Sequence, residues 1–193
     1  MKVITDDIRV YDSSWWNMRW TRIKRRLRKY YSLPGYMGKV WPKIAERIGE
    51  RSVLEFGCGP GLFSQFVKGH YIGVDWSAEA IKQAQARFPK RLFFADDFQN
   101  IGIKADVCVA FELFEHLEKP QELVAHMLIC APVAILSCPS EWWGEKVIRK
   151  AQRPGQHTRY HYATYNQGDI RAMFPGVKFL FADRQHYFFE IAR

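Results

Sequence analysis

Strand-like and helix-like segments alternate along most of this chain, and that alternation limits the folds that it can adopt. From residue 51 onward, short runs rich in valine, isoleucine and phenylalanine are separated by stretches with helical periodicity. Such a pattern predicts an α/β fold with a mostly parallel sheet. The last two strands, within 177–193, are joined so tightly that they must be antiparallel, because parallel neighbours need a long crossover. We therefore expect seven strands, the last one inverted at or near an edge.

The expected elements are read from periodicity and from turn residues. Strands are expected within 51–57, 70–76, 91–97, 105–113, 132–140 and, as a pair, 177–193. Helices are expected within 42–48, 61–68, 77–88, 120–131 and 166–174, and a longer one precedes Pro34. Ser77 is positioned to cap the third of these helices, and Pro120 to begin the fourth.

The segment VLEFGCGPG, residues 53–61, runs from a predicted buried strand into Gly57, Gly59 and Gly61. Glycine-rich turns between a strand and a helix let a ligand approach the backbone closely, and many bind nucleotides. The spacing is G-x-G-x-G, whereas dinucleotide-binding folds use G-x-G-x-x-G. Glu55 precedes the first glycine, and a carboxylate there would repel a pyrophosphate but suit a cationic ligand. S-adenosylmethionine, which carries an ammonium and a sulfonium, is such a ligand.

Acidic residues also follow the next two predicted strands. Asp75 comes at the end of the second strand and can accept hydrogen bonds from both hydroxyls of a ribose. Trp76 follows it and can lie against an adenine face, while Asp96 or Asp97 can accept from the adenine amino group. Each feature alone also fits a plain turn or a helix cap. Together, at the carboxyl ends of successive strands, they predict a cofactor crevice.

These segments make the chain similar to the class I S-adenosylmethionine-dependent methyltransferases, in particular the ubiquinone-pathway type and the type 11, 12 and 23 group. The resemblance covers roughly residues 42–193. It is carried by VLEFGCGPG, GVDWS, FFADDF and DVCVAFELFEHLEKP, in the family's order and spacing. It implies a Rossmann-like sheet of strand order 3-2-1-4-5-7-6 with strand 7 antiparallel. It also implies transfer of a methyl group from S-adenosylmethionine.

The resemblance further implies which residues contact the cofactor. The implied set is Glu55, Gly57, Gly59, Gly61, Asp75, Trp76, Asp96, Asp97, Phe111 and Glu112. In the family the glycines pass along the methionine part, Glu55 orients the loop and approaches the amino group, and Asp75 holds the ribose. Asp96 meets the adenine, and Phe111 with Glu112 closes the site from strand 4. Trp76 is bulkier than the family's usual aliphatic residue, which leaves the geometry of its adenine contact open.

Glu112, Glu115 and His116 lie just past the fourth predicted strand and allow two interpretations. In the first, His116 is the catalytic base, with His157 and His161 as further candidates, because histidine has an unperturbed pKa near 6.5. In the second, the three residues and a later histidine hold Mg²⁺ or Mn²⁺, which resembles metal-dependent RNA ribose methyltransferases. Glu115 and His116 also fit the cap of a short helix. We favour the interpretation without a metal.

The connection after the fifth strand, residues 139–166, is too long for a plain loop, and loops of that length are usually functional. It carries several tryptophan, tyrosine, histidine and arginine residues. In the family an insertion here covers the substrate together with the N-terminal helices. The same aromatic residues also fit simple packing within such a lid, with the arginines in solvent.

A basic segment precedes the α/β part. Residues 1–51 hold 13 lysines or arginines and 5 acidic residues, whereas residues 52–193 hold 16 and 15. Tryptophan, isoleucine and leucine recur on one face of its predicted helix, at Trp16, Trp20, Ile23 and Leu27. We interpret 1–41 as a helical lid and 42–193 as the methyltransferase domain. Attraction of an anion, such as RNA or a membrane surface, is a second property of the charge and less favoured.

The sequence thus predicts a methyltransferase that acts on an oxygen or nitrogen of a small, aromatic or anionic acceptor. The alternatives are an RNA ribose 2′-O-methyltransferase and a cofactor-binding protein without methyl transfer. The chain contains no C-x-x-C pair, no signal-peptide pattern and no apolar run long enough to span a membrane. We therefore expect reduced, buried cysteines and a cytoplasmic protein.

Overall fold

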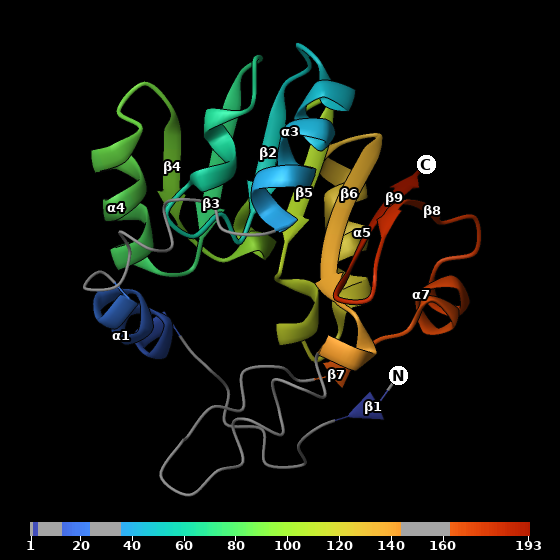
Figure 1. Cartoon of the computed structure of the whole chain (residues 1–193). Helices are drawn as coiled ribbons and strands as arrows, with labels where there is room; N and C mark the ends of the chain where they lie inside the picture. Colours follow the sequence, from blue (N-terminus) through green and yellow to red (C-terminus); the bar gives the residue numbers. More distant parts are fainter. Residues whose placement is uncertain (1, 4–12, 24–35, 144–162) are drawn as a thin grey trace, which may run out of the picture. The chain divides into compact units, whose positions relative to one another are not determined.

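A computed structural model describes residues 2–3, 13–23, 36–143 and 163–193 (Figure 1). It contains a seven-stranded sheet with strand order β4-β3-β2-β5-β6-β9-β8. In chain order these strands are 3-2-1-4-5-7-6, so the predicted topology is confirmed. Two compact units divide the chain, residues 10–109 and residues 110–193 with 1–9. We call them the N-terminal and the C-terminal unit.

The N-terminal unit contributes the parallel part of the sheet. Its helices and strands are α1 (Ser13–Ile23), α3 (Tyr36–Ile48), β2 (Val53–Phe56), β3 (Tyr71–Asp75), α4 (Ala78–Arg87) and β4 (Leu92–Ala95). The strand β5 (Val107–Phe111) begins in this unit and ends in the other. Strand β2 is parallel to β3 and to β5, and β3 is parallel to β4. Parallel strands end at one edge, so the turns after β2, β3 and β4 are brought together.

The C-terminal unit contributes the antiparallel part. Its elements are α5 (Pro120–Cys130), β6 (Val133–Pro139), α7 (Gln167–Met173), β8 (Lys178–Ala182) and β9 (His186–Ala192). Strand β9 is antiparallel to both β6 and β8, as the short final turn predicted. A two-stranded sheet that the pattern did not predict pairs β1 (Lys2–Val3) with β7 (Ala163–Thr164). Pairs this short leave almost no periodicity to detect.

The helix predicted to begin at Pro42 begins earlier, at Tyr36, and Pro42 lies inside it. A proline inside a helix costs about 3 kcal/mol, because it removes a backbone hydrogen bond and crowds the preceding turn. The helix persists because one face of it is buried: Val40, Trp41, Ile44, Ala45 and Ile48. Each large apolar side chain buried there contributes about 1.5–3 kcal/mol, so burial outweighs the proline.

The helix predicted at 61–68 is also wrong. Only one 3-10 turn forms there, Leu62–Gln65. The chain must turn back at Gly69, where an added Cβ would lie 2.3 and 2.4 Å from the carbonyl oxygens of Glu50 and Arg51. The caps predicted at Ser77 and Pro120 are present.

All four cysteines, Cys58, Cys108, Cys130 and Cys138, are buried and free of disulfides, as predicted. Within the described ranges, no helix combines the length and hydropathy that a membrane crossing requires. The C-terminal part of the predicted basic helix, including Leu27, lies outside the described residues.

Candidate functional site

The three loop glycines all have left-handed backbone conformations, which L side chains rarely adopt. Their φ angles are 68° at Gly57, 52° at Gly59 and 72° at Gly61. Packing also requires a glycine at position 61, because an added Cβ there would lie 2.6 Å from Cε1 of Phe93. At Gly59 an added Cβ would instead meet the indole ring of Trp20, at 2.9 Å. The second glycine therefore exposes backbone to the side chain of α1.

Asp75 ties the glycine loop to the turn after β3. Its Oδ2 accepts a hydrogen bond from the Gly59 amide at 2.8 Å, and its Oδ1 accepts one from the Ser77 amide at 2.8 Å. Burial raises the pKa of this carboxyl to about 6, although both backbone hydrogen bonds work in the opposite direction. A carboxylate has about four lone-pair directions. Two of them remain for hydroxyl donors such as those of a ribose.

Glu55 lies deeper, with 3% of its surface exposed, and accepts a hydrogen bond from the Tyr71 hydroxyl. Burial raises the pKa of Glu55 to about 8, against the lowering effect of that hydrogen bond. The group is therefore largely protonated at neutral pH. A cation brought beside it would favour the ionised form, so the position suits a positively charged ligand group.

Trp76, which follows β3, and the two acids that follow β4 lie at the same edge of the sheet as the glycine loop. Trp76 is 46% exposed, which is unusual for so large an aromatic side chain. The Asp96 amide donates to the Asp75 carbonyl oxygen at 3.1 Å, so the turns after β3 and β4 are joined. Asp96 is exposed, while Asp97 caps the 3-10 turn Phe98–Asn100 by accepting from the Gln99 amide. The helix-cap interpretation thus holds for Asp97.

Phe111 and Glu112, predicted to belong to the same site, lie in the C-terminal unit. The Phe111 ring is 6% exposed and packs at 5.9 Å from the ring of Phe188. Glu112 has a φ of 55°, the only positive value at a non-glycine residue in the part of the chain that the structure describes. A left-handed residue of this kind costs of order 1 kcal/mol and marks sites that are held in place by their surroundings.

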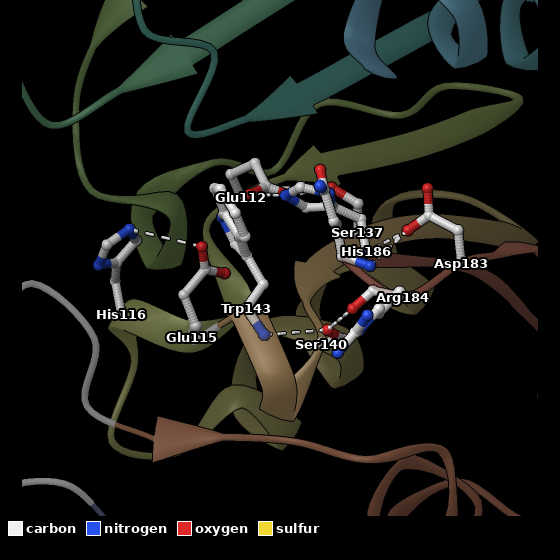
Figure 2. Close-up of polar contacts among 10 residues, drawn as sticks. Glu112, Glu115, His116, Ser137, Ser140, Trp143, Asp183, Arg184 and His186 are labelled. Atoms are coloured by element: carbon white, nitrogen blue, oxygen red, sulfur yellow. Dashed lines mark hydrogen bonds and ion pairs between the residues drawn. The ribbon is translucent and has the colours of Figure 1, made fainter. Parts of the chain in front are cut away.

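Ser137, in the middle of β6, holds that conformation (Figure 2). Its hydroxyl donates to Glu112 Oε1 at 2.9 Å and accepts from the Glu112 amide at 3.2 Å. On the other side, Nε2 of His186 lies 3.6 Å from Glu112 Oε2. Burial lowers the pKa of His186 to about 4, so this imidazole is neutral at physiological pH. Glu112 is therefore held between a hydroxyl and a neutral imidazole.

Glu115 and His116 form a second pair in the short 3-10 turn Phe114–His116 (Figure 2). His116 Nε2 lies 3.6 Å from Glu115 Oε1, and 14% of the His116 side chain is exposed. Glu115 is almost fully buried, and its Oε2 has no hydrogen-bond partner among the described residues. Burial, followed by the charge of Glu112, holds the pKa of Glu115 well above its usual range. His116 is the more accessible member of the pair.

The segment after β6 is attached to the turn between β8 and β9. Ser140 donates from its hydroxyl to the Arg184 carbonyl oxygen at 2.6 Å, and the Trp143 amide donates to Ser140 Oγ at 3.2 Å. The Arg184 guanidinium stacks 4.0 Å from the centre of the Trp142 ring, and the Trp143 ring lies 6.2 Å from that of His186. These contacts begin the long connection, most of which lies outside the described residues.

The sequence interpretation missed Ser137 and His186. Ser137 could have been found as a serine that interrupts the apolar run of β6. His186 could have been found from the strand pairing, because the antiparallel register places it opposite Pro139 at the carboxyl end of β6. His157 and His161 lie outside the described residues. Within the described ranges, no cluster of three or more histidine, cysteine or acidic side chains is arranged to hold a metal ion.

Comparison with known proteins gives one family. A family model described as a methyltransferase domain matches residues 19–179, most of the chain. A probable S-adenosylmethionine-dependent methyltransferase of Mycolicibacterium smegmatis is 27% identical over 92 residues, 45% of this chain and 36% of that protein. One of Mycobacterium tuberculosis strain H37Rv is 30% identical over 84 residues, 40% of this chain and 31% of that protein. The chain thus spans about a third of the length of these curated relatives.

Solved structures match over nearly the whole chain. Magnesium protoporphyrin IX methyltransferase from Synechocystis PCC 6803, with bound S-adenosylhomocysteine, superposes with a TM-score of 0.69. The match covers 96% of this chain and 98% of that one at 20% identity. The plantazolicin methyltransferase BpumL superposes with a TM-score of 0.68, covering 92% and 94% at 14% identity. At such identities the likeness establishes a shared fold.

Proposed function

Because this chain belongs to the S-adenosylmethionine-dependent methyltransferase family, we propose that it transfers a methyl group to an oxygen or nitrogen of a small, aromatic or anionic acceptor. The observation that supports this most is the joining of three strand-end turns at one edge of the N-terminal unit. Asp75 links the glycine loop to the turn after β3, and its carbonyl oxygen links that turn to Asp96. One residue thus holds all three turns together, two of them through its carboxylate and the third through its backbone carbonyl.

The residues at this edge fit S-adenosylmethionine by their chemistry. Asp75 has two lone-pair directions left for ribose hydroxyls, and the exposed Trp76 offers a flat apolar face for adenine. Glu55 would face the amino group, with the loop glycines beside the methionine part, and Asp96 would accept from the adenine amino group. We choose Asp96 over Asp97 because it is the more exposed of the two, although its Oδ1 also accepts from the Asp97 amide and from Asn100 Nδ2, both at 2.8 Å.

When bound, S-adenosylmethionine supplies a methyl group activated by its sulfonium. The protein then has mainly to orient the acceptor and to accept the proton that the acceptor loses. His116 is our candidate base, because its imidazole is partly exposed whereas the buried imidazole of His186 has a pKa near 4. Glu115, 3.6 Å away, would orient the His116 ring. Glu112, also in the C-terminal unit, would contribute an acid whose direction Ser137 and His186 control.

Calorimetry with S-adenosylhomocysteine tests the cofactor assignment. We expect wild-type protein to bind, and Asp75→Ala and Gly59→Val to lose binding by at least about a hundredfold. The first variant removes a ribose anchor, and the second places a branched side chain at a left-handed position against Trp20, which distorts the loop. Gly102→Ala is a matched control, because an added Cβ at Gly102 would meet nothing within 4 Å. Thermal melting of each variant without ligand checks folding. Wild-type affinity in a folded Asp75→Ala protein would refute the assignment.

Methyl transfer to small phenols, amines and carboxylates tests the acceptor side. His116→Ala should lower kcat by about 10²- to 10⁴-fold, as expected for loss of a general base, and leave the KM for the cofactor unchanged. EDTA should leave the rate unchanged. Loss of activity in EDTA, restored by Mg²⁺ or Mn²⁺, would instead support the metal-dependent ribose methyltransferase. His157→Ala and His161→Ala test the two further candidates in the same assay.

A further inference from the structure

Helix α1 is anchored on the N-terminus of α4 by one side chain. Oδ1 of Asn17 accepts a hydrogen bond from the Ser77 hydroxyl at 2.8 Å and one from the Glu79 amide at 3.0 Å. The amides in the first turn of a helix have no partner within that helix, so Asn17 satisfies a donor that would otherwise need water. The Ser77 hydroxyl in turn caps α4 by accepting from the Ala80 amide. In Figure 1, α1 lies at one end of α4.

One helical turn further along α1, Trp20 rests on the glycine loop. Its Cζ2 and Cη2 atoms lie 2.9 and 3.2 Å from the position that a Cβ on Gly59 would take. The ring is therefore in contact with the Gly59 backbone, and no residue with a side chain fits at that position without displacing it. The Gln83 side chain also donates to the Trp20 carbonyl oxygen at 3.5 Å, which adds a contact from α4.

These contacts connect the same two points that Asp75 connects. Asp75 binds the Gly59 and Ser77 amides, while α1 contacts Gly59 through Trp20 and Ser77 through Asn17. The glycine loop and the turn after β3 are thus fixed relative to each other twice, once by a carboxylate and once by a helix. All the residues involved belong to the N-terminal unit.

We propose that Asn17 and Trp20 are positioning residues for cofactor binding, and that α1 is part of the cofactor site. A loop with three left-handed glycines has many accessible conformations, and ordering it on binding costs free energy. Trp20, held by Asn17, restricts the loop before the cofactor arrives and so reduces that cost. The proposal rests on the assignment of the glycine loop to the cofactor, and it differs from the prediction that this helix is a lid over the acceptor.

The test measures S-adenosylhomocysteine binding by calorimetry and the two KM values by kinetics. We expect Asn17→Ala and Trp20→Ala each to raise the Kd and the cofactor KM by about tenfold. Asn17→Ala removes two ordinary hydrogen bonds, and Trp20→Ala removes the contact that orders the glycine loop. The KM for the acceptor should stay within about twofold. Met18→Ala is the matched control, because Met18 is an exposed residue of the same helix.

Conservative variants separate positioning from simple loss of stability. Asn17→Asp keeps an oxygen that accepts both hydrogen bonds, and Trp20→Phe keeps a ring over Gly59, so both should stay within about threefold of wild type. Unchanged or tighter binding in a folded Trp20→Ala protein would overturn the proposal, as would a rise confined to the acceptor KM. If Asp75→Ala also binds normally, the cofactor assignment itself has failed. If only Asp75→Ala loses binding, the role of α1 has failed.

Discussion

Asp75 has a pKa near 6, and this makes the proposed cofactor site sensitive to pH. Its carboxylate accepts hydrogen bonds from two backbone amides, which lower its pKa. Burial has the larger effect and raises the pKa above the ordinary value of an aspartate. A protonated carboxyl offers fewer acceptor positions to a ribose. Occupation by the cofactor and protonation of Asp75 therefore oppose each other.

We predict that the Kd for S-adenosylhomocysteine rises about tenfold between pH 7 and pH 5, because the ionised fraction of a group with a pKa of about 6 falls about tenfold over that range. Glu55, with a pKa of about 8, is mostly protonated in the free protein in this window, so any ionisation of Glu55 beside the bound amino group would add to the slope in wild type and in Asp75→Asn alike. Calorimetry of the wild-type and Asp75→Asn proteins at five pH values measures how the Kd for S-adenosylhomocysteine depends on pH. The Asp75→Asn protein should bind more weakly and lose the tenfold change that Asp75 contributes, and a flat wild-type profile would contradict the prediction.

Some residues were predictable and others were not, for identifiable reasons. Gly57, Gly59, Gly61 and Asp75 stand out because their type and spacing are local in sequence. The glycines have left-handed φ values and Asp75 accepts from the Gly59 amide, while their role at the cofactor stays a prediction. His186 was missed because only strand pairing brings it to Glu112, 74 positions earlier in the chain by their numbers. A histidine near the C-terminus has no sequence pattern that connects it with an acid after β5.

At the scale of elements, α3 is the clearest case in which tertiary burial outweighs local propensity. Its buried face begins at Val40, before Pro42, and that face determines where the helix lies. Local rules place a helix start at a proline, so the sequence predicted too short a helix. The strands of the seven-stranded sheet were predicted well because they are apolar runs, and glycine, aspartate or proline stands at or beside at least one end of most of them. The strands β1 and β7 have only two residues each and were missed.

We predict that Pro42→Ala raises the free energy of unfolding by about 1–3 kcal/mol. Alanine restores the amide that proline lacks and has the best intrinsic helix propensity. Urea denaturation followed by circular dichroism measures the change, and Lys43→Ala, at the exposed neighbouring position, is the control. Destabilisation by Pro42→Ala would mean that the proline ring itself packs favourably, and would refute the explanation given for α3.

At the scale of the whole molecule, the family and the fold were predictable while the acceptor was not. The methyltransferase family model reaches from residue 19 to residue 179, so it includes part of α1 and the strands from β2 to β6. The fold follows from alternation, turn chemistry and three strand-end motifs, all of which are encoded locally. The segments predicted to cover the acceptor include residues 144–162 and 24–35, which lie outside the described ranges. The assignment of 1–41 as a separate lid remains a prediction, and for α1 we propose a role at the cofactor.

The uneven charge is the remaining property of the whole chain, since 13 of its 29 basic residues lie in the first 51 positions. Exposed charges act mainly through screened, long-range attraction, so their effect should depend on the acceptor's charge and on salt. We predict that the triple variant Arg22→Glu, Arg25→Glu, Arg26→Glu raises the KM of an anionic acceptor by about three- to tenfold at low salt. It should leave the KM of a neutral acceptor nearly unchanged.

The control for that experiment reverses three exposed lysines elsewhere, Lys68, Lys90 and Lys178, and so changes the net charge equally. If the control has the same effect, the total charge matters rather than the basic segment. A salt titration with a short RNA tests the alternative partner. RNA binding that falls steeply with salt and disappears in the Arg22, Arg25 and Arg26 variant would favour a nucleic-acid substrate, because each phosphate contacted releases counterions. Absence of RNA binding at low salt, together with the KM shift, would support attraction of a small anionic acceptor.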